Sequence, residues 1–166
     1  MPRVSIVTTV FDRVDCLRRC LRSVQHLHFR DVEQIVVSVS PPEEPWQEID
    51  HLCAEFGVKH YTLPRRMNDW GISPANAGLR ASTGEFVCFL SDDNAFLPDH
   101  FGPLVAALDA DPGLGFAYSS CLYAGHKELR QNPPAGAGID LGQPLFRRSI
   151  LTFLYREEKV VEGPSL

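Results

Sequence analysis

A short apolar segment that ends in two adjacent acids constrains this chain most. Residues 85–90, Glu-Phe-Val-Cys-Phe-Leu, follow a glycine, and Ser91, Asp92 and Asp93 come directly after them. A strand this apolar is typical of the middle of a sheet that helices cover on both faces. The carboxyl edge of such a sheet is where open α/β folds bind their ligands. We therefore expect Asp92 and Asp93 to lie at a binding site.

The pair of acids has two interpretations. Two neighbouring carboxylates repel each other unless a positive group lies beside them, and a divalent metal ion with a bound phosphate meets that need. Alternatively, Asp92 and Asp93 cap the helix that follows, because Asp and Asn are favoured at turns and at helix N-termini. The pair alone does not decide between a metal site and a helix cap.

Strand and helix patterns alternate along the rest of the chain, which predicts helices packed on a mostly parallel sheet. The expected strands are residues 4–10, 34–39, 58–63, 85–90 and 114–120, and the expected helices are residues 14–24, 46–56, 75–82, 98–110 and 144–155. Asp12 is expected to cap the first helix. Residues 131–138, rich in Pro, Gly and Ala, are expected to connect the last two elements.

Bulk properties limit the class of protein. At 166 residues the chain is long enough for one domain with a substantial core. A net charge of −5 argues against nucleic-acid binding. No apolar run reaches the roughly 18–20 residues that span a bilayer, and the first apolar segment is too short for a signal peptide. The five cysteines are scattered without a disulfide pattern, so we expect a cytoplasmic location.

Two blocks of the sequence resemble one known family. Asn76-Ala77-Gly78, then Gly84-Glu85-Phe86, then the acids form the first block, and residues 4–13, Val-Ser-Ile-Val-Thr-Thr-Val-Phe-Asp-Arg, form the second. Together they resemble the nucleotide-sugar-dependent glycosyltransferases of family 2, whose apolar strand ends in an Asp-x-Asp-type motif. Ser91-Asp92-Asp93 occupies that motif, with Ser in place of the first acid. The resemblance covers most of residues 2–110.

The resemblance implies a three-layer α/β/α fold, the Rossmann-like GT-A fold, with a mostly parallel central sheet. Residues 1–166 would form a single domain, in which residues 1–110 bind the nucleotide sugar. Similar chains usually continue for several tens of residues, so residues 111–166 would form only part of the acceptor-binding region. The implied reaction is inverting transfer of a sugar from a UDP- or dTDP-linked donor to an acceptor hydroxyl.

The resemblance also assigns roles at the donor site. Asp93 would bind Mn²⁺ or Mg²⁺, and Asp92 would hydrogen-bond the ribose hydroxyls. The implied nucleotide-sugar contacts are Thr8, Thr9, Val10, Ser38, Val39 and Asn76, of which Ser38 and Val39 stand where the family has an acidic pair facing the nucleobase. A Ser hydroxyl accepts the same hydrogen bond without charge. Asn76 and Gly78 are expected to set the packing of their helix rather than to do chemistry.

An inverting reaction needs a general base, and Asp140 is the candidate. It is the only acid in residues 138–148, where the family places the base. The alternative is that Asp140 forms a turn or a helix cap. Arg147 and Arg148, just beyond it, either contact the diphosphate or begin the exposed face of the predicted helix.

The sequence leaves one other class of function open and argues against two more. A catalytically inactive GT-A module would bind a nucleotide or a protein partner, and the unusual Val39 is compatible with it. Sugar-phosphate nucleotidyltransferases and dinucleotide-binding oxidoreductases need a glycine-rich loop after the first strand, and residues 10–13 contain no glycine. The expected partners are a nucleotide diphosphate sugar and a carbohydrate or other hydroxyl acceptor. No transmembrane segment is expected, peripheral membrane association is compatible with the sequence, and no pattern indicates an oligomeric state.

Overall fold

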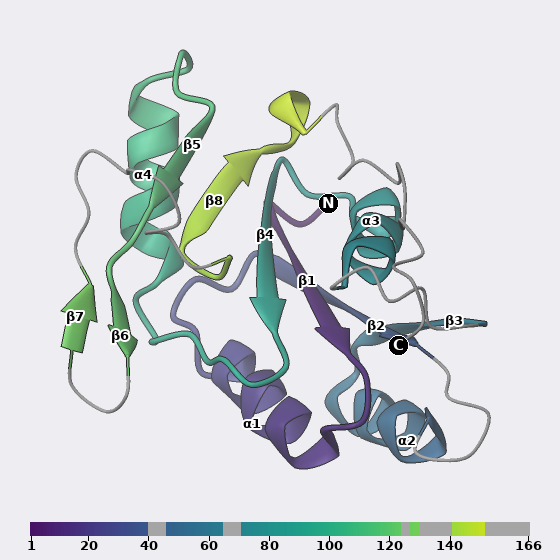
Figure 1. Cartoon of the computed structure of the whole chain (residues 1–166). Coiled ribbons are helices and arrows are strands. Elements are labelled where there is room, and N and C mark those ends of the chain that lie inside the picture. The colour runs from purple at the N-terminus through teal and green to yellow at the C-terminus, as the bar shows by residue number, and fades with distance from the viewer. Residues whose placement is uncertain (40–45, 65–70, 124–126, 130–140, 152–166) are drawn as a thin grey trace, which may run out of the picture.

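The computed structural model describes residues 1–39, 46–64, 71–123, 127–129 and 141–151 (Figure 1). They form a three-layer α/β structure around a six-stranded sheet with the order β3-β2-β1-β4-β8-β5. Its strands are β1 (Val4–Val10), β2 (Val32–Val39), β3 (Lys59–Leu63), β4 (Phe86–Ser91), β5 (Phe116–Tyr118) and β8 (Pro144–Arg147). The helices are α1 (Val14–Gln25), α2 (Trp46–Phe56), α3 (Ile72–Ala81) and α4 (Phe101–Ala110), with a 3₁₀ turn, η1, at Arg148–Ile150. A separate antiparallel pair joins β6 (Cys121–Tyr123) and β7 (Lys127–Leu129).

The two strands predicted to be interior are interior. β1 pairs in parallel with both β2 and β4, and β4 lies between β1 and β8. From β1 the chain crosses to β2 and β3 on one side and then returns to β4 on the other side of β1. The carboxyl ends of β1 and β4 therefore flank the point where the winding direction reverses, and ligands of open α/β sheets bind at such a point.

Helices cover both faces of the sheet because strand residues alternate between them. Ile6 and Cys88 face α1 and α4, and Val36 faces α1 and α2. Val7 and Val87 face α3 on the opposite side. In Figure 1, α1 and α2 lie together below the sheet and α3 lies across it from them. Each large aliphatic side chain buried in these layers contributes about 1.5–3 kcal/mol relative to leaving it exposed.

Gly78 allows α3 to lie unusually close to the sheet. A Cβ atom built at this position would lie 2.3 Å from Val7 Cγ1 and 3.3 Å from Val37 Cγ2. Normal contact between carbon atoms is about 3.5–4.0 Å, so only glycine fits between the helix and these two strands. The expected packing role of Gly78 is confirmed.

Three local predictions are wrong. Residues 144–147 form β8 instead of the predicted helix, and residues 152–155 lie outside the described part of the chain. β8 pairs with the edge of β4 whose backbone groups would otherwise be buried without partners, and Pro is tolerated as its first residue. The strand predicted over 114–120 is reduced to β5, followed by β6. Asp12 does not cap α1, because Arg13 is the N-cap residue and no side chain caps that end.

No helix within the described ranges is both long enough and apolar enough to cross a lipid bilayer.

Candidate functional site

Arg13 joins the two predicted acids at the carboxyl edge of the sheet. Asp92 and Asp93 lie in the turn directly after β4, and Arg13 lies three residues beyond the end of β1. The Arg13 Nε atom donates to Asp92 Oδ2 at 3.0 Å, and Nη2 donates to Asp92 Oδ1. Nη1 donates to Asp93 Oδ2 at 2.7 Å. One guanidinium therefore binds Asp92 through two hydrogen bonds and Asp93 through one.

The two carboxylates differ in their access to solvent. The Asp92 side chain is 2% exposed, whereas the Asp93 side chain is 44% exposed. Burial raises the pKa of Asp92, and the guanidinium of Arg13 opposes that rise. The hydrogen bond to Asp92 in turn raises the pKa of Arg13. Asp92 is thus an internal anchor for Arg13, and Asp93 is the acid that an outside ligand can reach.

The acids do not cap the following helix. The next helix, α4, begins at Phe101 and has His100 as its N-cap residue. Asp92 and Asp93 therefore lie too far along the chain to bind its first N–H groups. This geometry removes the helix-cap interpretation of the pair.

The sequence indicated that the two acids need a positive neighbour, but Arg13 was not predicted to be that neighbour. The position of Arg13 in the sequence could have indicated this contact. The turn after the first strand contains Arg13, and neighbouring parallel strands bring their carboxyl ends to the same edge. Thr9 lies opposite Ser91 in the register of β1 and β4, so the turns that follow the two strands begin side by side.

The oxygen atoms available at this edge suit a metal ion that is held partly by protein carboxylates and partly by a bound phosphate. No group of three His, Cys, Asp or Glu side chains gathers anywhere in the described residues. Mg²⁺ is commonly held by one or two carboxylates together with substrate phosphates, and Mn²⁺ also favours oxygen ligands. The exposed oxygen atoms of Asp93 fit that pattern, so Asp93 is the residue that would hold such an ion.

Two of the three predicted contacts at the end of β1 have buried side chains. Thr8 is fully buried, and its Oγ1 accepts a hydrogen bond from Gln34 Nε2 at 2.9 Å. Val10 is also buried, while Thr9 is partly exposed. Only the backbone groups of Thr8 and Val10 are therefore candidates for contact with a ligand.

Ser38 belongs to a chain of hydrogen bonds that the sequence did not predict. Ser38 Oγ lies 2.8 Å from His60 Nε2, and His60 Nδ1 lies 3.0 Å from Asp50 Oδ1. With Nδ1 donating to Asp50, the Nε2 atom accepts the Ser38 hydroxyl proton. The order Ser-His-Asp is that of a hydrolase triad, but Ser38 is 1% exposed, so its oxygen has no access to a substrate. These hydrogen bonds fix the orientation of the Ser38 hydroxyl near the end of β2.

Two further predicted contacts are also buried. Val39, the last residue of β2, is 8% exposed, and Asn76 is fully buried in α3. The complete burial of Asn76 agrees with its expected role in packing. Direct contacts of Ser38, Val39 and Asn76 with a nucleotide remain predictions.

Comparison with known proteins identifies the family. A sequence model described as "Glycosyl transferase family 2" matches residues 5–159. The chain belongs to glycosyl transferase family 2. A relative from Campylobacter jejuni, GalNAc(5)-diNAcBac-PP-undecaprenol beta-1,3-glucosyltransferase, is 24% identical over 91% of this chain and 48% of its own length. Glycosyltransferase GlyA from Streptococcus pneumoniae is 25% identical over 70% of this chain and 17% of its own length.

Solved structures confirm the GT-A fold of this family 2 chain. Residues 1–349 of S. aureus TarS superpose with a TM-score of 0.72 and 16% identity, covering 91% of this chain and 48% of TarS 1–349. The mannosyltransferase PcManGT from Pyrobaculum calidifontis, in complex with GDP-Man and Mn²⁺, gives a TM-score of 0.70 and 17% identity over 90% of this chain and 46% of its own. The chain thus spans at most about half the length of these relatives.

The expected general base of this family 2 chain, Asp140, lies outside the described residues. Arg147 and Arg148, just beyond it, do not approach the acids. Arg147 lies opposite Phe86, the first residue of β4, and its Nη2 donates to the Leu108 carbonyl at 2.6 Å. Arg148 donates to Ser82 Oγ. Both arginines are at the amino edge of β4, away from the acids, which argues against a diphosphate contact at that site. Arg148 begins the short 3₁₀ turn η1 instead of the longer helix that was predicted.

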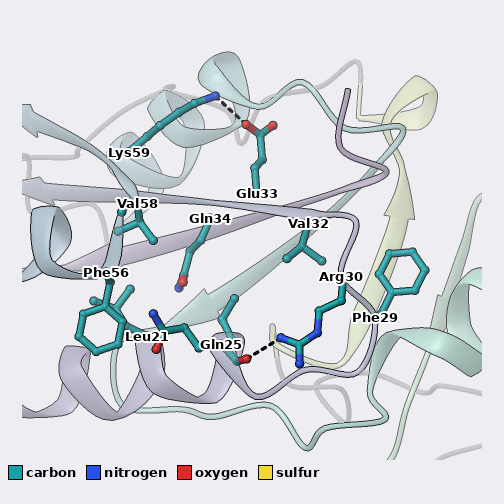
Figure 2. Close-up of a pocket in the computed structure, with 12 residues that line it drawn as sticks. Leu21, Gln25, Phe29, Arg30, Val32, Glu33, Gln34, Phe56, Val58 and Lys59 are labelled. Carbon is teal, nitrogen blue, oxygen red and sulfur yellow. Dashed lines mark hydrogen bonds and ion pairs between the residues drawn. The ribbon is translucent and has the colours of Figure 1, made fainter.

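A pocket of about 330 Å³ lies away from the acids, between the ends of α1 and α2 and the starts of β2 and β3 (Figure 2). Its walls include Leu21 and Phe56, and the Glu33–Lys59 ion pair at 2.7 Å lies at its rim. The Gln34 Oε1 atom lacks a hydrogen-bond partner within the described residues. This pocket lies at the amino edge of the sheet and is separate from Asp92 and Asp93, which follow the carboxyl end of β4.

Proposed function

We propose that this chain contains the donor site of an inverting glycosyltransferase. It transfers a sugar from a UDP- or dTDP-linked donor to a hydroxyl of a carbohydrate or other acceptor, with Mn²⁺ or Mg²⁺. The observation that carries the proposal is the place of Asp92 and Asp93. They stand where the winding of the sheet reverses, in a chain of glycosyl transferase family 2. Solved structures of similar proteins support it, because TarS was solved in complex with UDP-GlcNAc and PcManGT in complex with GDP-Man and Mn²⁺.

The chemistry requires charge compensation at the leaving group. Breaking the bond between the anomeric carbon and the phosphate leaves a nucleoside diphosphate with growing negative charge. A divalent cation held by Asp93 supplies the opposite charge. Arg13 lies beside Asp93 and is half exposed, so it is a second source of positive charge at the same edge.

The nucleoside would lie along the carboxyl ends of β1 and β2. Backbone groups of Thr8, Thr9 and Val10 are proposed to contact the base, and Ser38 and Val39 are proposed to border it. Asp92 remains a candidate for the ribose hydroxyls. Because its side chain is 2% exposed and both its oxygens accept from Arg13, we assign its main role to holding Arg13.

Asp140 is the proposed general base for the acceptor hydroxyl. β8 runs antiparallel to β4, so its first residue, Pro144, points toward the edge where β4 ends in the acids. The described residues 141–143 lead into β8 from that side. This direction supports the proposal that the segment containing Asp140 contributes to the site.

The acceptor and its location are also proposals. The Campylobacter jejuni relative is named for transfer to an undecaprenol-linked glycan. We propose an acceptor hydroxyl on a carbohydrate, a cytoplasmic location for this chain, and peripheral contact with a membrane where the acceptor is lipid-linked.

Binding calorimetry tests the donor site. UDP, dTDP and GDP are titrated with Mn²⁺, with Mg²⁺ and with a chelator. Asp93→Asn keeps the shape of the side chain and removes its charge, so metal-dependent affinity should fall at least tenfold, about 1.4 kcal/mol. Asp99→Asn is the matched control, because Asp99 is 84% exposed and pairs with His28 rather than with Arg13.

Two outcomes would count against the proposal. Metal-independent nucleotide binding, or equal affinity in Asp93→Asn and wild type, would refute the role of Asp93. Donor binding without transfer to any hydroxyl acceptor would favour the inactive module instead.

A further inference from the structure

Arg13 already binds the Asp93 carboxylate that would hold a metal ion. Its Nη1 atom is 2.7 Å from Asp93 Oδ2, which is a short, charge-assisted hydrogen bond. A divalent cation that ligates Asp93 would stand within a few ångströms of this guanidinium. Like charges so close repel each other strongly, and more so at a partly buried site. The cation and the Arg13–Asp93 bond therefore compete.

The charges of the site show when a cation can displace Arg13 from Asp93. Two carboxylates and one guanidinium leave a formal charge of −1. A divalent cation alone would turn the site positive beside a guanidinium that cannot lose its proton. A nucleoside diphosphate brings two to three negative charges together with the cation and restores a negative site. The charge count favours cation and diphosphate as a pair over the cation alone.

Arg13 is held so that only one of its contacts is easily exchanged. Its two bonds to Asp92 are partly buried, and its backbone carbonyl accepts a bond from Leu17 N at 2.9 Å at the start of α1. Its single bond to Asp93 faces solvent, since that carboxylate is 44% exposed. Releasing Asp93 frees an N–H of Nη1 on a planar guanidinium, a group that suits phosphate oxygens.

We propose that Arg13 makes metal binding at Asp93 conditional on a bound nucleoside diphosphate. Without nucleotide, Arg13 holds Asp93 and excludes the cation. With nucleotide, Arg13 keeps Asp92, gives up Asp93 to the cation and donates its released Nη1–H to the diphosphate. The inference rests on the proposed function, and it assigns to this arginine the selectivity for the metal–nucleotide pair.

Free Mn²⁺ measured by electron paramagnetic resonance tests the inference without any activity assay. In the absence of nucleotide, wild type should bind Mn²⁺ weakly, and Arg13→Gln should bind it at least tenfold more tightly. Arg18→Gln is the matched control, because Arg18 lies on α1 and pairs with Glu55 at 3.0 Å. It should behave as wild type. With UDP present, wild type should gain Mn²⁺ affinity, and Arg13→Gln should gain less.

A second variant covers the case in which Arg13→Gln does not fold because Asp92 is left buried without a partner. The double variant Arg13→Gln/Asp92→Asn removes that uncompensated charge and keeps Asp93. It should show the same gain in nucleotide-free Mn²⁺ affinity.

Unchanged Mn²⁺ affinity in the folded variants would overturn the inference. So would wild type that binds Mn²⁺ as tightly without nucleotide as with it. Wild type that binds no nucleotide under any condition would contradict the proposed function. In that case the nucleotide-free comparison of Arg13→Gln with wild type still decides whether Arg13 excludes the cation.

Discussion

Replacing Gly78 with Ala should destabilise the protein through a clash between α3 and the sheet. The new Cβ would lie 2.3 Å from Val7 Cγ1, more than 1 Å inside normal contact, and 3.3 Å from Val37 Cγ2. Val7 is 1% exposed and interior to the sheet, so it has no room to withdraw. Overpacking of this kind costs about 1–3 kcal/mol, and sometimes more. The higher helix propensity of Ala offsets about 1 kcal/mol of that cost.

Gly102→Ala is the matched control for this prediction. Gly102 lies in α4, and nothing is within 4 Å of a Cβ built there. The same substitution should therefore raise stability by up to about 1 kcal/mol. Urea denaturation followed by far-ultraviolet circular dichroism measures both free energies of unfolding. If Gly78→Ala is as stable as Gly102→Ala, the close approach of α3 to β1 is not real.

Three further outcomes are expected. Burial lowers the pKa of His100 from 6.5 to about 4. Between these two pH values the unfolded state therefore binds the proton more readily than the folded state. The free energy of unfolding should fall by at most about 3 kcal/mol as the pH drops from 6.5 to 4. His100→Leu should flatten that part of the pH profile measured by thermal denaturation, and an unchanged profile would contradict the reasoning. Asp140→Asn should slow sugar transfer about 10²–10⁴-fold while donor affinity in calorimetry stays unchanged, and transfer at the wild-type rate would place the base elsewhere. Ser38→Ala should cost about 1–3 kcal/mol in urea denaturation because His60 Nε2 loses its 2.8 Å partner, and a neutral effect would show that the hydrogen-bond chain is unimportant.

The sequence predicted the parts of the fold that depend on continuous apolar runs. β1 and β4 were expected as buried interior strands, and their pairing on both sides confirms it. Such strands are recognisable because both faces must be apolar, whatever their neighbours are. The glycine at position 78 was also interpretable, since its packing role follows from its place in a helix between apolar strands.

The errors occur where local patterns fit more than one structure. The run Pro144-Leu145-Phe146 suits a helix start or a strand, and only the open edge of β4 decides for a strand. The β6–β7 pair consists of strands of three residues each, too short to give a periodic signal.

The candidate site was predicted in position but not in its contacts. Asp92 and Asp93 are at the expected edge, yet their differing burial depends on how the turn after β4 meets the turn after β1. The sequence suggested a metal ion as the positive neighbour, and the structure places Arg13 there. The bond between Ser38 and His60 likewise joins separate strands, and its origin is the register of β2 and β3, not a local motif.

A crystal structure of the protein grown with UDP and Mn²⁺ tests the central claim most directly. The anomalous scattering of manganese locates the ion independently of the electron density of the nucleotide. Our account predicts one peak within ligand distance of both Asp93 and the diphosphate, the uridine along the ends of β1 and β2, and Arg13 still bound to Asp92. Nucleotide and manganese bound elsewhere, with Arg13 still holding Asp93, would contradict it.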